Sequence, residues 1–93
     1  MKARARGGTR ATVAGRVVRV RACGDGGWRI RLAETGGALA AAEIRPSNPL
    51  PPPPVGARIV LRGALRYDDE HGWYAVDPVE IWIVMAPSPL LPG

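Results

Sequence analysis

The sequence contains no phenylalanine and only one cysteine, and no apolar stretch approaches the roughly 20 residues that a membrane-spanning helix needs. The single cysteine, Cys23, excludes an internal disulfide and a zinc site built from several thiolates. The first ten residues, MKARARGGTR, lack the apolar run of a signal peptide. These absences predict a cytoplasmic protein that does not enter a membrane.

The chain also has few of the residues from which catalytic sites are built. His71 is its only histidine, and no serine or cysteine stands at a spacing that indicates a nucleophile with its base. The turn at residues 68–71, Asp-Asp-Glu-His, offers ligands for a divalent ion, but aspartate is also an ordinary turn residue. We therefore expect no enzymatic activity, no catalytic residue, no bound metal and no cofactor.

Arginine is abundant, whereas lysine is nearly absent. The net charge is +5, but Lys2, Arg4, Arg6 and Arg10 supply most of it, and residues 11–93 hold nine arginines against eight acids. Residues 11–62 are basic and residues 63–93 are acidic, which creates a field that a phosphate backbone can follow. Compositional drift toward GC-rich codons would also produce this arginine content.

Prolines and the two ends divide the chain. Residues 1–10 are expected to form a disordered basic arm, and residues 86–93, APSPLLPG, an irregular proline-rich tail. Residues 45–55, RPSNPLPPPPV, are rich in proline, which removes backbone donors and excludes a helix or a central strand. We expect a stiff connection there; the alternative is a ligand for an SH3-like groove.

The region between arm and tail has the pattern of five β-strands. The runs VAGRVVRV and GWRIRLA form one hairpin, ALAAAEI follows, and the two apolar runs of residues 58–84 form a second hairpin around an acidic turn. In the second strand Trp28, Ile30 and Leu32 alternate with Arg29 and Arg31. The alternation predicts that the two arginines face outward.

Two strands change phase along their length. The first keeps Val13 and Val17 on one face with Gly15 and then shifts at Val18, which predicts a bulge that bends the strand and lets it serve two sheets. The last breaks phase at Asp77-Pro78, where proline indicates a bulge or an edge.

The phase of that last strand places Val79, Ile81 and Ile83 on one face. If these residues are core, Trp82 lies on the outer surface beside Glu80. An exposed indole of this kind typically marks a protein contact.

The order and spacing of these strands resemble the OB fold, a five-stranded Greek-key barrel with a long, bent first strand. The resemblance is carried by V-x-G-x-V at residues 13–17, DGGWRIRL at 25–32, AEI at 42–44 and VGARIVLRGALRY at 55–67. It implies an all-β, OB-like barrel over residues 11–85. The usual helix between strands three and four is missing, which implies a poorly plugged barrel bottom or cover by another chain. SH3-like barrels are the structural alternative.

The resemblance also implies a ligand face across strands two and three and their flanking loops. It implies binding of single-stranded DNA or RNA with low sequence specificity, through cations and stacking aromatic rings. Alternatively, Arg29 and Arg31 pair with Glu43 across the hairpin and only keep the face solvated. The residues nominated for nucleic-acid binding are Arg21, Arg29, Arg31, Arg62, Arg66, Tyr67, Trp73 and Tyr74.

A second functional interpretation is a protein-interaction module or a subunit of a larger complex, because a fold does not fix a function. In that case Trp82 is the predicted contact, with a different protein or with a second copy of the chain.

Overall fold

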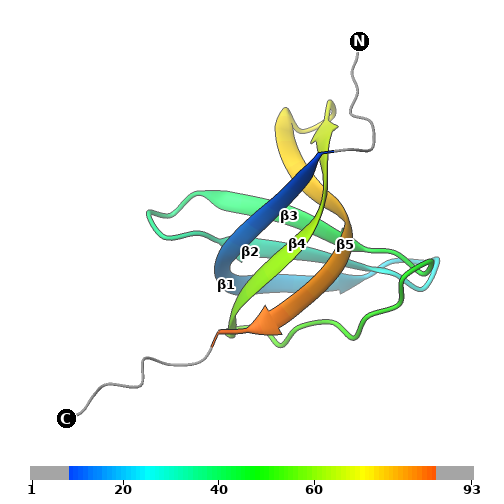
Figure 1. Ribbon diagram of the computed structural model, residues 1–93, viewed down its shortest axis with the longest axis horizontal. Coiled ribbons are helices and arrows are strands. Elements are labelled where there is room, and N and C mark those ends of the chain that lie inside the picture. Colours follow the sequence, from blue (N-terminus) through cyan, green and yellow to red (C-terminus); the bar gives the residue numbers. More distant parts are fainter. Residues whose placement is uncertain (1–8, 86–93) are drawn as a thin grey trace.

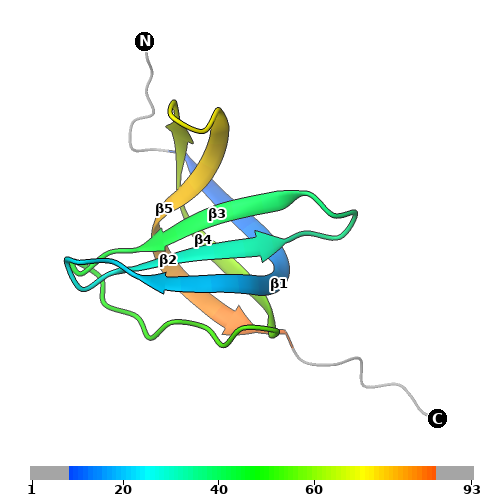
Figure 2. The ribbon, with the colours of Figure 1, turned by 180° about the vertical axis from the view of Figure 1, so that it is seen from behind.

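The first strand, β1 (Arg10–Ala22), bends sharply and belongs to two walls of a closed barrel. The computed structural model describes residues 9–85 (Figures 1 and 2). The other strands are β2 (Trp28–Ala33), β3 (Leu39–Ile44), β4 (Arg58–Asp68) and β5 (Trp73–Val84), and the barrel order is β1-β2-β3-β5-β4. The expected all-β barrel of five strands is confirmed, and its strand order is compatible with an OB-like fold.

The described residues contain no helix that is long and apolar enough to cross a membrane. Most of the predicted arm, residues 1–8, and the whole predicted tail, residues 86–93, lie outside the described residues. Arg10 was assigned to the arm, but it is the first residue of β1.

The bend in β1 lies where the sequence predicts a bulge. Residues 10–16 pair with β4, residues 16–22 pair with β2, and the register with β2 shifts between Val17 and Arg19. The barrel therefore has a β1–β4–β5 wall, in front in Figure 1, and a β1–β2–β3 wall, in front in Figure 2. One bent strand connects the two.

Alternation along the strands fills the interior. In β2, Ile30 and Leu32 are fully buried while Arg29 is exposed, as the sequence predicts. Ile59 and Leu61 of β4 are buried as well. The core comprises Val17, Ile30, Leu32, Ala42, Ile44, Ile59, Leu61, Val76 and Val79.

The predicted phase of the last strand is wrong beyond Val79. Ile81 and Ile83 are 55% and 58% exposed, whereas Trp82 packs against the core. The reason is an irregularity in the ladder: Val79 pairs with Gly63 and Ile81 with the preceding residue of β4, so Glu80 is an extra residue. Side chains after Glu80 consequently point to the opposite face from the one predicted.

The proline-rich connection plugs the bottom of the barrel. Leu50 packs against the core and Pro53 is buried. The Asn48 side-chain amide donates to the carbonyl oxygens of Val79 (3.2 Å) and Glu80 (3.1 Å), and the Trp82 indole donates to that of Pro51 (2.8 Å). The expectation of a poorly plugged barrel is therefore wrong, because this loop covers the edge of β5 that β3 leaves unpaired.

Gly63 permits the close crossing of β4 and β5. A Cβ atom there would overlap the Pro78 carbonyl oxygen and lie 2.8 Å from the Val76 side chain. We expect Gly63→Ala to lower the free energy of unfolding by about 2 kcal/mol, measured by urea denaturation. The matched control is Gly24→Ala, because a Cβ at Gly24 would meet nothing within 4 Å. Equal stability of the two variants would contradict this account of the crossing.

Candidate nucleic-acid interface

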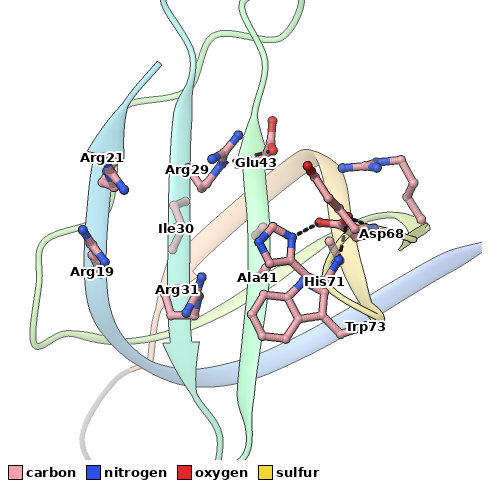
Figure 3. A pocket seen from close by; sticks show the side chains of 14 residues that line it. Arg19, Arg21, Arg29, Ile30, Arg31, Ala41, Glu43, Asp68, His71 and Trp73 are labelled. Atoms are coloured by element: carbon pink, nitrogen blue, oxygen red, sulfur yellow. Dashed lines mark hydrogen bonds and ion pairs between the residues drawn. The ribbon is translucent and has the colours of Figure 1, made fainter. Parts of the chain in front are cut away.

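A pocket of about 320 Å³ lies on the outer face of the β1–β2–β3 wall. The hairpin that joins β4 to β5 forms its other side (Figure 3). Each strand contributes side chains from its outward phase, so the same alternation that builds the core builds the pocket. The lining residues that matter most are Arg19, Arg21, Arg29, Arg31, Asp68 and Trp73.

Four arginines face one another across β1 and β2. Arg19 is directly opposite Arg31, and Arg21 is directly opposite Arg29. Like charges in directly opposed positions destabilise a sheet. Glu43 offsets the charge of Arg29, because its carboxylate lies 3.3 Å from the Arg29 Nε. The alternative interpretation is thus right for Arg29, whereas Arg31 forms no ion pair with any described residue. Arg19 and Arg21 form no ion pair with any residue between 9 and 85, so the face keeps an uncompensated positive charge.

Trp73 is the aromatic ring of the pocket. The Arg31 guanidinium lies 4.8 Å from the centroid of the indole, and the His71 ring is stacked on it at 5.1 Å with an interplanar angle of 12°. The indole Nε1–H is buried and has no hydrogen-bond partner among the described residues. Stacking and cation–π contact therefore hold this ring in place, without a hydrogen bond that fixes its orientation.

The acidic turn positions His71 against the indole. The Asp68 carboxylate accepts hydrogen bonds from His71 Nδ1 (2.8 Å) and from the backbone N–H groups of Glu70 (3.0 Å) and His71 (3.3 Å). The His71 hydrogen bond lowers the pKa of Asp68 and outweighs desolvation. Ligand atoms of Asp68, Glu70 and His71 lie within 4.8 Å of one another, but the hydrogen bonds of the turn account for this arrangement.

A chain of ion pairs ties the pocket to the rest of the barrel. Asp77, which is buried, binds Arg45 through both carboxylate oxygens (2.7 and 2.6 Å) and binds Arg66 Nε at 2.8 Å. Arg45 also lies 3.4 Å from Glu43, which in turn contacts Arg29. These linked ion pairs therefore join four strands and the start of the proline-rich connection.

The charges of these linked ion pairs determine how Asp77 titrates. Burial alone would raise the pKa of Asp77, but the hydrogen bonds and positive charges of Arg45 and Arg66 outweigh it and hold the pKa below its ordinary value. The hydrogen bond with Asp77 likewise raises the pKa of Arg45. Asp77 is thus ionised at neutral pH and holds both arginines in place.

The predicted site residues divide into two groups. Arg21, Arg29, Arg31, Arg66 and Trp73 line the pocket together. The remaining four do not line it: Tyr67, Tyr74, Arg62 and Trp82.

Three of the residues outside the pocket lie on other faces, and the fourth, Trp82, packs against the core. Tyr67 and Tyr74 are cross-strand partners with an edge-to-face ring contact at 5.0 Å, and their register places them on the opposite face of the hairpin from Trp73. Arg62 is exposed on the β1–β4–β5 wall.

Sequence reasoning missed Arg19 and Asp77. Arg19 has the same outward phase as Arg21 beyond the bulge, and pairing the first hairpin in register would have placed it opposite Arg31.

A scan against protein-family models and a search of curated proteins find no match to this chain.

Proposed function

We propose that this chain is an OB-fold module that binds single-stranded DNA or RNA with low sequence specificity. The observation that carries the proposal is the pair of arginine rows on β1 and β2, which place like charges opposite each other beside the half-buried indole of Trp73. Phosphates would neutralise the arginines, and a base would take the place of the His71 ring against Trp73. The closed barrel with its bent first strand supports the OB assignment, in which the ligand lies on this same wall.

The charges of the pocket favour one orientation of the strand. Arg19 and Arg21 lie on its β1 side, whereas Glu43 and Asp68 lie on the side of β3 and the hairpin (Figure 3). Glu70 belongs to the same hairpin. A phosphate is attracted to the first side and repelled from the second. We infer that the backbone follows β1 and β2 and that the bases point toward β3 and Trp73.

A substitution at Trp73 tests the stacking. We expect Trp73→Ala to weaken binding of a fluorescein-labelled oligodeoxythymidine of about 15 nucleotides by about 1 to 3 kcal/mol, because one stacked base loses its platform. Fluorescence anisotropy of the label at two salt concentrations measures the affinity. Trp73→Phe keeps a ring and should retain most of the affinity.

Tyr74→Ala is the matched control, because Tyr74 is an exposed aromatic residue of the same hairpin outside the pocket. If Tyr74→Ala weakens binding more than Trp73→Ala does, the bases do not stack in the pocket.

The second candidate function is a protein-interaction module, and the exposed isoleucines of β5 favour it. The prediction that Trp82 contacts a partner assumed an outward indole, but the indole packs inward and bonds to Pro51. Ile81 and Ile83 occupy the outward positions in its place. We therefore transfer the proposed contact from Trp82 to these two residues.

A further inference from the structure

The outer face of the β1–β4–β5 wall has an apolar centre between charged ends. The strand register arranges it in rows that run across the three strands (Figure 1). The central row is Ala14, Val60 and Ile83. Thr12, Arg62 and Ile81 form the row on one side, and Arg16 and Arg58 oppose each other on the other side.

The charges on this face are positive and uncompensated. Arg16, Arg58 and Arg62 are exposed and form no ion pair with any residue in the described part of the chain. Glu80 lies at the end of the face, but it is already bound by Arg10 at 2.6 Å. The wall thus presents aliphatic side chains flanked by cations that have no acid to neutralise them.

We propose that this wall binds an acidic amphipathic polypeptide segment. Val60, Ile81 and Ile83 would contact its apolar side chains, and Arg58 and Arg62 would bind carboxylates at its two ends. A second copy of the same wall would bring arginines against arginines, which repel. A nucleic acid would find no aromatic ring for its bases, because the outward positions are aliphatic, threonine or arginine.

The spacing of the arginines sets the spacing of the acids. Arg58 and Arg62 are four residues apart on one strand, which corresponds to about 13 Å. A helix returns to the same face about every seven residues, which advance it by about 10.5 Å, and the flexible arginine and glutamate side chains span the remaining few ångströms. It would therefore carry two carboxylates about seven residues apart and leucine-like side chains between them on the same face.

The test uses the full chain with labelled methyl groups and a helical, alanine-based peptide of about 15 residues. The peptide carries two glutamates about seven residues apart and leucines between them on the same face. Three probes serve as controls: the peptide with its leucines replaced by alanine, the peptide with its glutamates replaced by lysine, and oligodeoxythymidine. Because none of the residues proposed to bind the peptide lines the pocket, the result is independent of nucleic-acid binding.

We expect the acidic leucine peptide to shift the methyl signals of Val60, Ile81 and Ile83 and neither control peptide to do so. Ile81→Ser/Ile83→Ser should weaken its binding at least about tenfold, and Arg58→Glu/Arg62→Glu should abolish it. Both variants change exposed side chains, so unaltered thermal unfolding should show that they fold.

Three results would overturn the proposal. The first is no methyl shift at millimolar peptide. The second is the same set of shifts with oligodeoxythymidine, which would assign the wall to nucleic acid. The third is a concentration-dependent shift of these methyls without peptide, which would make a second copy the occupant.

Discussion

Replacing Arg19 and Arg21 together by alanine is expected to weaken binding of a single-stranded oligonucleotide by roughly 25-fold at about 0.1 M salt. Each phosphate contact to a single strand contributes a slope of about 0.7 in the logarithm of affinity against the logarithm of salt concentration. Two lost contacts therefore lower the slope by about 1.4. At about 0.1 M salt this difference in slope corresponds to a roughly 25-fold loss of affinity. Anisotropy titrations at several salt concentrations measure both quantities.

The same variant should not be less stable than the native chain. Arg19 and Arg21 oppose Arg31 and Arg29, so their removal relieves two contacts between like charges. A loss of affinity with unchanged or raised stability is typical of residues kept for binding. Urea denaturation of the variant and the native chain provides this comparison.

Arg58→Ala/Arg62→Ala is the matched control, because it removes the same charge from exposed positions on the opposite wall. We expect it to change oligonucleotide affinity by less than about threefold, as more distant charges are screened. If the control loses as much affinity as the pocket variant, binding depends on net charge alone and the pocket is not the interface.

Asp77→Ala should destabilise the barrel by about 3 kcal/mol, at the lower end of the range for removing one partner of a buried ion pair. The lower end applies because Asp77 is buried but the side chains of Arg45 and Arg66 are 42% and 44% exposed. Water can therefore solvate the two guanidinium groups in part once their ion pairs with Asp77 are lost. The variant leaves two arginines without their carboxylate next to the β3–β5 junction. Stability unchanged within experimental error would show that the ion-pair chain does not support the barrel.

The contribution of Asp77 should depend on pH in a defined direction. Its folded-state pKa lies below the ordinary value of 3.8, so its ion pairs stabilise the barrel fully above about pH 4. The stabilisation is lost as the pH falls through the lower, folded-state pKa. The difference in unfolding free energy between the native chain and Asp77→Asn should therefore be constant near neutrality and shrink below about pH 4. A difference that stays constant into acid would contradict the ion-pair assignment.

Local sequence patterns predict most of this barrel, because alternation and turn residues act over a few positions. They place Ile30 and Leu32 inside, Arg29 outside and a bulge near Val18, as found. They fail at Trp82, because the extra residue at Glu80 depends on distant contacts. Among these are the crossing of β5 with Gly63 and the hydrogen bonds from Asn48, which no local pattern reveals.

The sequence also indicates part of the pocket, but not all of its residues. The phase of β2 predicts that Arg29 and Arg31 face outward, and the resemblance to the OB fold implies that they share a site with Trp73; the structure brings the three together. Asp77 was interpreted only as part of a bulge, because its partners, Arg45 and Arg66, are 32 and 11 residues away in sequence. An ion pair across such separations depends on the closure of the barrel.

The most direct test of nucleic-acid binding on the β1–β2–β3 wall is a heteronuclear NMR titration of the full chain with oligodeoxythymidine at low salt. The account predicts that the Trp73 indole N–H and the Nε–H signals of Arg19, Arg21 and Arg31 shift first and most, while the methyl signals of Ile81 and Ile83 stay in place. Shifts confined to residues 1–10, or centred on the isoleucines of β5, would contradict it.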